Sequence, residues 1–367
     1  MKRLFLLYIW ILIILPILFI SGGCRRPAAA RDDGKITVTS LTFPSYDFVR
    51  AIAGDRVNLV LLTSPGMESH SFEPSPRDVI SIRDSDVFIY PGGHGSLWMD
   101  RILEPLELSG GSGPRILRLL DMVEGLEEEF VEGMEVYHGD EHGHDDHDDH
   151  DEPGDHDHDD DHDEHDDHDE HGDHGHDDDH DEHDDGHDHD EPELDEHVWT
   201  SPRNAVLIVA ALTEALVEMD PVNGDFYRQN AAAYITQLRE LDRDFQAVVS
   251  GAGRNLILVG DRFPFRYLAH HYGLDYFAAF SGCSTDTEPS AATVAFLINQ
   301  VREHQLPAVF HIELSNGRIA DTISEATGAL KLQLHSAQNV SMRDFNDGIT
   351  YLDIQRGNVE NLREALW

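Results

Sequence analysis

The sequence has little cysteine and little positive charge. Its two cysteines, Cys24 and Cys283, are too few for a zinc ribbon or any other site built from four thiolates. Lys and Arg number 26 against 72 Asp and Glu, which gives a formal net charge of −46. A polyanion without a basic stripe repels phosphate backbones, so nucleic acid is excluded as a partner.

Much of the acidic excess lies in one tract, residues 138–190. The tract contains 17 His and 29 Asp or Glu, with no Lys or Arg, and so contributes −29 to the net charge. Imidazole and carboxylate are ligands that zinc accepts, but a segment without apolar residues cannot form a core. The tract therefore predicts a disordered loop that binds divalent cations, without indicating what the protein does with them.

The N-terminus has the pattern of an export signal. Lys2 and Arg3 precede an apolar run at residues 4–20, and small residues lead directly to Cys24. This resembles a bacterial lipoprotein signal in which Cys24 becomes the lipidated first residue, which leaves Cys283 without a disulfide partner. The alternative is an uncleaved membrane anchor, since 17 apolar residues are marginal for a membrane span. Either reading places the body of the protein outside the cytoplasm.

Short β-rich runs alternate with amphipathic segments on both sides of the tract. This βα alternation predicts an α/β fold with two lobes, each a parallel sheet flanked by helices. Strands are expected at residues 36–41, 57–63, 87–90, 256–260, 307–313 and 330–335. Helices are expected near residues 46–53, 76–83, 97–106, 201–219, 265–272, 290–304, 318–327 and 359–366.

A long helix is expected to join the two lobes. From residue 223 to about 249, apolar residues recur at spacings of three and four, and a helix of about 25 residues is about 38 Å long. The predicted organisation is a lipoprotein signal peptide (1–24), a tether (25–34), an N-terminal lobe (35–221) that includes the His- and Asp-rich loop (138–196), a linking helix (222–250) and a C-terminal lobe (251–367).

Two segments carry specific motifs. Residues 66–78 read Gly-Met-Glu-Ser-His-Ser-Phe-Glu-Pro-Ser-Pro-Arg-Asp, and residues 195–204 read Asp-Glu-His-Val-Trp-Thr-Ser-Pro-Arg-Asn. In this order they resemble the zinc and manganese solute-binding proteins of bacterial ABC importers. In that family the two histidines are metal ligands from the N-terminal lobe, which implies that His70 and His197 bind metal here. The resemblance also implies two lobes joined by a rigid helix, with the metal in the cleft between them.

The C-terminal lobe matches that family with substitutions. The family's third histidine corresponds to Asp261, at the expected start of a helix, and its acidic fourth ligand corresponds to His335. The resemblance thus implies three histidines and one carboxylate. Glu313 is a weaker candidate, as a ligand or as a partner that fixes a histidine tautomer. Asp261 could instead pair with Arg262 or Arg266, or cap the following helix.

The expected function is capture of Zn²⁺ as a transported ligand and its delivery to an ABC permease in the cytoplasmic membrane. Three imidazoles and one carboxylate favour zinc over manganese. The protein is expected to be a monomer anchored by lipid to the outer face of the membrane, with the His-rich loop as a low-affinity zinc collector or sensor. Cys283 is expected to be an unliganded thiol. An enzyme is not expected, since no His-Glu-x-x-His motif occurs. The alternative is a zinc storage, buffering or adhesion protein that uses mainly the loop.

Overall fold

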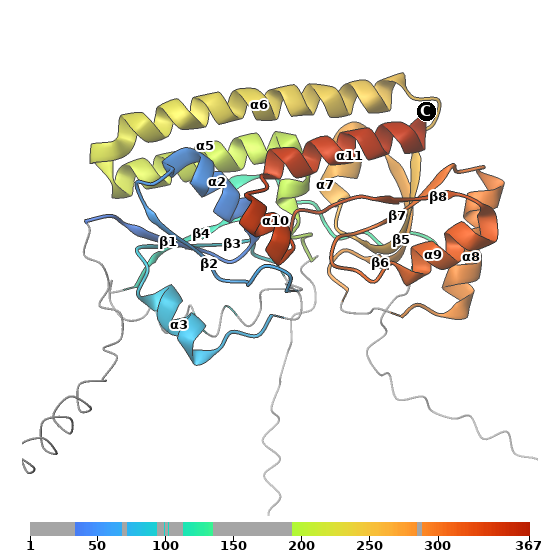
Figure 1. Ribbon diagram of the computed structural model, residues 1–367, viewed down its shortest axis with the longest axis horizontal. Coiled ribbons are helices and arrows are strands. Elements are labelled where there is room, and N and C mark those ends of the chain that lie inside the picture. Colours follow the sequence, from blue (N-terminus) through green and yellow to red (C-terminus); the bar gives the residue numbers. More distant parts are fainter. Residues whose placement is uncertain are drawn as a thin grey trace, which may run out of the picture.

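The computed structural model describes residues 34–67, 72–93, 99, 102, 113–134, 193–284 and 288–367. Within them lie two parallel four-stranded sheets, which confirm the predicted α/β class (Figure 1). The first sheet has the order β2-β1-β3-β4 and consists of β1 (Thr37–Ser40), β2 (Asn58–Leu61), β3 (Val87–Tyr90) and β4 (Arg115–Arg118). The second has the order β6-β5-β7-β8 and consists of β5 (Leu256–Phe263), β6 (Asp275–Ser281), β7 (Ala308–His311) and β8 (Leu330–Gln333).

Both sheets reverse their strand order at a central pair of strands. In the first sheet β1 lies between β2 and β3, and in the second β5 lies between β6 and β7. At such a reversal the connections leave the carboxyl ends of the two central strands in opposite directions and open a crevice, which is where open α/β sheets bind ligands. The fold therefore marks the ends of β1, β3, β5 and β7 as the places to look for a site.

The last residues of the first motif form the N-terminal cap of α3 (Pro76–Arg83). The Ser75 hydroxyl accepts a hydrogen bond from the Asp78 amide, and the Asp78 carboxylate accepts one from the Ser75 amide at 2.9 Å. Pro76 occupies the first helical position, where its missing N–H is not needed. The Ser-Pro-x-Asp part of the motif is thus explained by helix capping.

Three long helices lie along one side of the sheets. They are α5 (Pro202–Met219), α6 (Gly224–Gly251) and α11 (Tyr351–Leu366), and α6 crosses over both sheets (Figure 1). The buried residues of α6 include Tyr227, Tyr234, Leu241 and Val248, seven residues apart, and they join one hydrophobic cluster that contains residues of both sheets. The predicted long helix is confirmed, and the two lobes share a continuous core. Among the described helices, none is both long enough and apolar enough to span a membrane.

The C-terminal lobe is surrounded by α7 (Arg266–Tyr272), α8 (Ala291–Glu303) and α9 (Arg318–Thr327). After β8 the chain returns to the N-terminal lobe, where α10 (Met342–Asp347) packs beside α2 (Phe43–Ala53). Two backbone hydrogen bonds mark the crossing: Phe43 N–H to Gln338 O at 3.2 Å and Gly66 N–H to Val340 O at 2.7 Å. Residues within the predicted C-terminal lobe therefore help to hold the loops that follow β1 and β2.

The second motif lies between the lobes. Trp199, in the short 3₁₀ helix Val198–Thr200, is fully buried, and its indole N–H donates to Ser336 O at 2.9 Å. On the other side the Tyr351 hydroxyl donates to Trp199 O at 2.6 Å. Ser336 follows β8 and Tyr351 begins α11. Trp199 therefore connects the second motif to two elements of the C-terminal part of the chain.

We expect Trp199→Phe to lower the free energy of unfolding by about 2 to 3 kcal/mol, because the buried Ser336 carbonyl loses its donor and a void opens. Urea unfolding of the zinc-free protein measures this. Trp367→Phe is the matched control: its indole also donates to a carbonyl, Val248 O at 3.0 Å, but the side chain is 68% exposed. Equal losses in the two variants would contradict the role of Trp199.

Candidate metal site

Four of the five predicted metal ligands are described: His197, Asp261, Glu313 and His335. All four lie at or just beyond the carboxyl ends of strands or in the segment between the lobes. The fifth, His70, lies outside the described residues, as do Cys24 and the tract at residues 138–190.

His197 is held by the carboxylate of Asp195. The backbone N–H of His197 donates to Asp195 Oδ1 at 2.8 Å, and the ring Nδ1 lies 3.1 Å from the same oxygen. A carboxylate on Nδ1 keeps the proton there and places the lone pair on Nε2, which is the usual arrangement of a metal-binding histidine. The ring is fully buried and packs edge to face against the Trp199 ring, with 5.6 Å between the two ring centroids.

Negative charge is concentrated around this ring. Burial alone lowers the pKa of His197, but the charges of Asp195, Glu196 and Glu128 outweigh it and raise that pKa. Burial raises the pKa of Glu196 to about 7; the charge of His197 opposes this shift, and those of Asp195 and Glu128 add to it. A cation beside His197 would relieve the repulsion among these carboxylates, so the surroundings of this histidine favour a bound metal ion.

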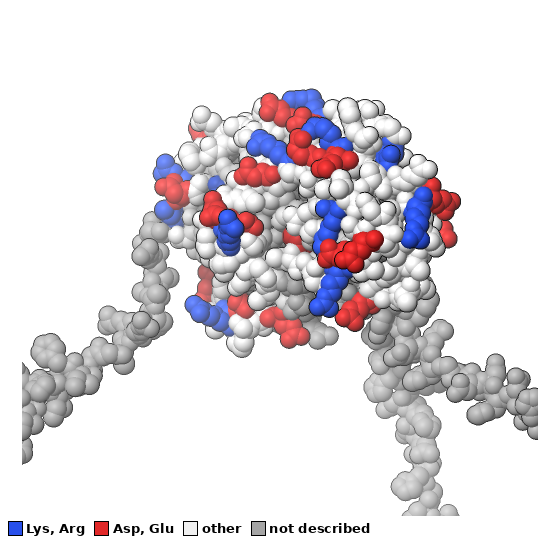
Figure 2. Space-filling model, turned by 45° about the vertical axis from the view of Figure 1, so that its right-hand side comes forward, with Lys and Arg blue, Asp and Glu red and all other residues white. Residues whose placement is uncertain are grey.

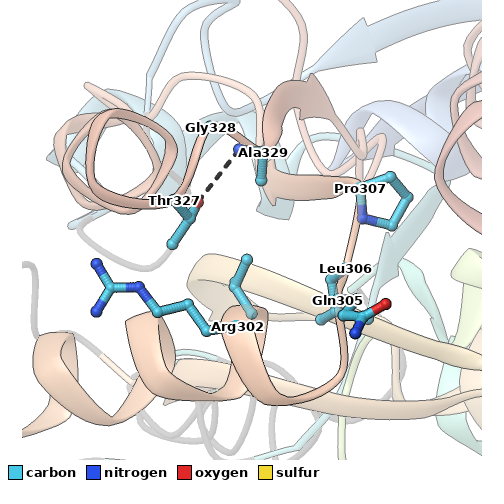
Figure 3. A pocket seen from close by; sticks show the side chains of 8 residues that line it. Arg302, Gln305, Leu306, Pro307, Thr327, Gly328 and Ala329 are labelled. Atoms are coloured by element: carbon cyan, nitrogen blue, oxygen red, sulfur yellow. Dashed lines mark hydrogen bonds between the residues drawn. The ribbon is translucent and has the colours of Figure 1, made fainter.

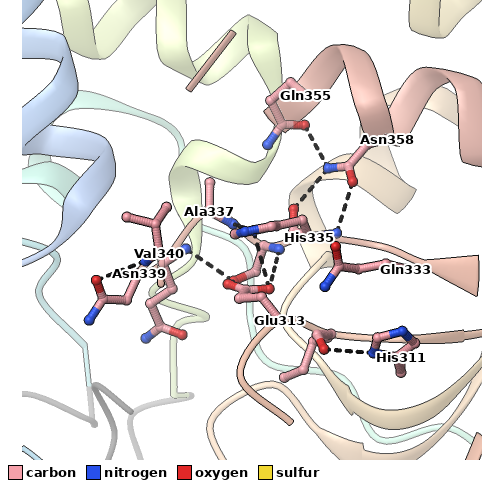
Figure 4. Close-up of polar contacts among 12 residues, drawn as sticks. His311, Glu313, Gln333, His335, Ala337, Asn339, Val340, Gln355 and Asn358 are labelled. Atoms are coloured by element: carbon pink, nitrogen blue, oxygen red, sulfur yellow. Dashed lines mark hydrogen bonds and ion pairs between the residues drawn. The ribbon is translucent and has the colours of Figure 1, made fainter. Parts of the chain in front are cut away.

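Glu313 and Ser336 form a second polar group, in the C-terminal lobe. Glu313 lies two residues after β7, and its carboxylate accepts the Ser336 N–H at 2.7 Å as well as the Ser336 hydroxyl. Because Ser336 O accepts the Trp199 indole, Glu313 is linked to the His197 segment through a single residue. Figure 4 shows Glu313 beneath the His335 ring and close to it.

His335 is fixed at both its backbone and its ring. The Asn358 side chain of α11 accepts from His335 N–H and donates to His335 O, each at 2.8 Å (Figure 4). Its ring Nδ1 accepts the Ala337 N–H at 2.9 Å and lies 3.4 Å from Glu313 Oε2. A neutral ring with Nδ1 as acceptor carries its proton on Nε2. Metal binding through His335 therefore requires the ring to turn or to give up the Ala337 hydrogen bond.

Asp261 does not begin a helix, contrary to the expectation from the sequence. It lies inside β5, which continues to Phe263 past an irregularity in its pairing with β6 between Val259 and Arg262. The alternative in which it caps the next helix is also wrong, since that helix follows Phe265 and has no side-chain cap. Instead, Asp261 Oδ1 accepts the Arg262 N–H at 3.0 Å, and burial raises the pKa of its carboxyl.

Asp261 also has an oxygen that suits a cation. Its Oδ2 is buried and has no hydrogen-bond partner among the described residues. The Asp261 carboxyl group also interacts with the Ser315 side chain and with the backbone of Ile312, and these two residues lie on either side of Glu313 in the sequence. The two acids of the C-terminal lobe therefore occupy the ends of β5 and β7, where the strand order of this sheet reverses.

The described side chains do not form a complete ligand set. Within the described ranges, no three His, Cys, Asp or Glu side chains lie close enough together to hold a metal ion. A small hollow nonetheless joins the lobes, lined by Glu313 and Ser336 on one side and by Met67 on the other. Asn339 fixes Met67 by donating to its carbonyl at 2.8 Å, and Met67 is the last described residue before the gap that contains His70.

Three residues near His197 were not expected from the sequence: Asp195, Glu128 and Gly282. A Cβ on Gly282 would lie 2.9 Å from Phe263 O and 3.1 Å from Asp195 Oδ2, so glycine lets this loop pass close to both. The next residue, Cys283, donates its N–H to Glu128 Oε1 at 2.9 Å. Burial and the nearby carboxylates raise the pKa of the Cys283 thiol, which is therefore protonated at neutral pH. The Asp-x-His spacing of the second motif is the one signal in the sequence that could have identified Asp195.

Another pocket in the C-terminal lobe has a different character. It lies between α8, α9 and the start of β8 and is lined by Arg302, Gln305, Pro307 and Thr327, with none of the predicted ligands (Figure 3). On the face drawn in Figure 2, acidic and basic side chains lie interspersed. One example on the described surface is the pair Lys331 and Asp321, 2.7 Å apart. Neither feature competes with the interlobe region as a metal site.

Comparison with protein families matches residues 38–365 to a family described as the periplasmic component A of the zinc-uptake complex. The high-affinity zinc uptake system protein ZnuA of Bacillus subtilis is 27% identical over 350 residues, which cover 94% of this chain and 92% of that protein. The zinc-binding lipoprotein AdcA of Streptococcus pneumoniae R6 is 28% identical over 91% of this chain, but the match spans only 56% of AdcA.

Solved structures with the same fold include metal-binding proteins. The Zn(II)-bound ZnuA-like domain of Streptococcus pneumoniae AdcA superposes with a TM-score of 0.65 at 24% identity, covering 91% of this chain and 99% of that domain. The periplasmic zinc-binding protein TroA of Treponema pallidum gives a TM-score of 0.64 at 19% identity, covering 90% and 99%. At these identities the likeness establishes the two-lobed fold with its long helix.

The raised pKa of Glu196 predicts a pH-dependent stability. Because the folded-state pKa of about 7 exceeds the usual 4.5, the folded protein holds this proton more tightly than the unfolded chain does. The stabilisation is present at low pH and is lost as the pH rises through about 7. We therefore expect the free energy of unfolding of zinc-free Glu196→Gln to fall less than that of the wild type between about pH 5 and pH 8 in urea titrations. Glu193→Gln, which changes an exposed carboxylate nearby, should keep the wild-type pH dependence.

Proposed function

Because the match covers nearly the whole described fold, the chain belongs to the family of periplasmic zinc-uptake components, and we propose that it captures Zn²⁺ in the interlobe cleft for delivery to an ABC permease. The family is one of receptors for uptake, which confirms that the protein is not an enzyme. The observation that carries the proposal is the buried His197, held by Asp195 and surrounded by carboxylates at the junction of the lobes.

The proposed ligands are His70 and His197 from the N-terminal lobe, with Asp261 and His335 from the C-terminal lobe. The burial and polarisation of His197 support its role, and the unpaired Oδ2 supports that of Asp261. Glu313 is the proposed partner of His335: once Nδ1 carries a proton instead of accepting the Ala337 N–H, it would donate to the Glu313 carboxylate, 3.4 Å away, and leave Nε2 free for the metal. Imidazole and carboxylate ligands without a thiolate suit a receptor whose cargo must later be released.

We propose that metal binding draws the ligands together, and that His335 must give up another contact to take part. His335 would exchange its Ala337 hydrogen bond for the metal, which lowers the free energy that it can contribute. His197 needs no such exchange at Nδ1, because its carboxylate partner already favours a lone pair on Nε2. His197 should therefore contribute more to affinity than His335.

The tract at residues 138–190 is the proposed low-affinity collector, and Cys24 is the proposed site of lipid attachment. The tract lies between the described residues 134 and 193, and residue 193 is only four positions before His197. Ions held loosely along it would raise the local zinc concentration beside the cleft. A lipid on Cys24 would hold the receptor at the outer face of the cell membrane, near the permease.

The ligand assignment is tested by zinc titration of the mature protein in competition with a chelator of nanomolar affinity. The chelator outcompetes weak sites, so the titration reports the tight site alone. We expect His197→Ala to weaken the tight site by more than about 100-fold, since even outer-shell partners of metal-bound histidines change affinity by 10- to 100-fold. His335→Ala should have a smaller effect. His304→Ala, at an exposed histidine, is the control. If His70→Ala combined with His197→Ala keeps the wild-type affinity, the assignment is wrong.

The collector role is tested by deleting residues 138–190. We expect the tight site to keep its affinity, because the proposed ligands lie outside the tract, while zinc uptake slows when zinc is scarce. Uptake of radioactive zinc by cells that carry each form, measured at scarce and at ample zinc, separates the two effects. Equal uptake by both forms at scarce zinc would rule out a collector.

A further inference from the structure

Tyr267 of α7 connects the C-terminal lobe to both sides of the tract. Its side chain is fully buried, and its hydroxyl accepts the Leu126 N–H at 3.1 Å and donates to Asp195 O at 2.8 Å. Leu126 precedes the tract and Asp195 follows it. One hydroxyl group therefore fixes two backbone positions that are separated by the whole insertion.

These two positions belong to a short paired structure, which we call the root and define as residues 126–128 and 193–195. Asp195 N–H donates to Leu126 O at 2.9 Å, and Glu128 N–H donates to Glu193 O at 2.8 Å. Between them Glu127 and Leu194 form an antiparallel bridge. The root is thus a short pair of segments, and Tyr267 binds its Leu126–Asp195 end.

Asp195 has each of its polar groups committed in this arrangement. Its N–H binds Leu126, its C=O binds Tyr267, and its carboxylate binds the N–H and ring of His197. The backbone contacts determine where the carboxylate points, and the carboxylate determines how the His197 ring is oriented. We propose that Tyr267 is a positioning residue for zinc capture, which acts through Asp195 on His197. This inference rests on the proposed role of His197 as a zinc ligand.

The size of the effect follows from the position of Tyr267. Partners that hydrogen-bond directly to a metal-bound histidine change metal affinity by about 10- to 100-fold. Tyr267 acts one residue further out, so we expect its hydroxyl to change the zinc dissociation rate by about 10-fold, the lower end of that range. Tyr267→Phe removes the hydroxyl while keeping the ring that packs in the core.

A purely structural role would affect stability alone, and Tyr276 provides the matched control. It lies on β6, is also buried, and its hydroxyl donates to Glu129 Oε2 at 3.0 Å. Glu129 directly follows the root. Tyr276→Phe thus removes another buried hydroxyl that joins the C-terminal lobe to the same segment, without touching Asp195.

The experiment uses the mature full-length protein loaded with Zn²⁺, from which an excess of chelator removes the metal. Weakly held ions leave in a fast phase, and the slow phase reports the tight site. We expect Tyr267→Phe to speed the slow phase by about 10-fold and Tyr276→Phe by less than about 2-fold, although both lower the melting temperature. Asp195→Asn should also speed the slow phase, and adding Tyr267→Phe to it should change the rate little further.

Two results would overturn the inference while leaving the proposed function intact. One is an equal effect of Tyr267→Phe and Tyr276→Phe, which indicates a structural role. The other is a double variant with Asp195→Asn in which the two effects multiply, which means that Tyr267 does not act through Asp195. A slow phase that survives unchanged in His197→Ala would instead overturn both the ligand assignment and the inference that rests on it.

Discussion

The packing of residues 195–201 between the two lobes is the constraint on which the rest of the structure depends. The buried Trp199 donates to the loop after β8 and accepts from the start of α11, while Asp195 accepts from α7. These bonds join parts of the chain that are up to 152 residues apart. Because the same segment carries His197, the lobes cannot separate widely without moving the candidate ligand.

Much of the fold could be predicted because its strands are short apolar runs bounded by turn residues. The strand at Val87–Tyr90 and the helices at Pro76–Arg83 and Arg318–Thr327 agree with the sequence analysis at both ends. By contrast, β4 was missed because charged residues flank its two apolar ones, and β6 because it follows α7 after only two residues. The first turns of α11 were missed although Thr350 and Asp353 form a capping box there.

The candidate site was predictable where its contacts are local. Asp195 and His197 are two residues apart, so the motif already contains the pair that forms. Asp261 was placed at a helix start because the extension of β5 depends on its pairing with β6, which is nearly 20 residues away. The contact of Glu313 with Ser336 spans 23 residues and depends on how β7 and β8 pair. Periodicity in a single segment contains no information about such pairings.

Because the root pairs the two ends of the insertion, the length of the insertion does not affect the geometry of the fold. Since the two ends of the insertion already lie side by side, lengthening the loop between them adds only closure entropy, about 0.6 kcal/mol for each doubling. Repeats of histidine and aspartate can therefore be gained or lost by replication slippage without disturbing the cleft. The number of histidines between the two ends can therefore change in evolution without altering the contacts that orient His197.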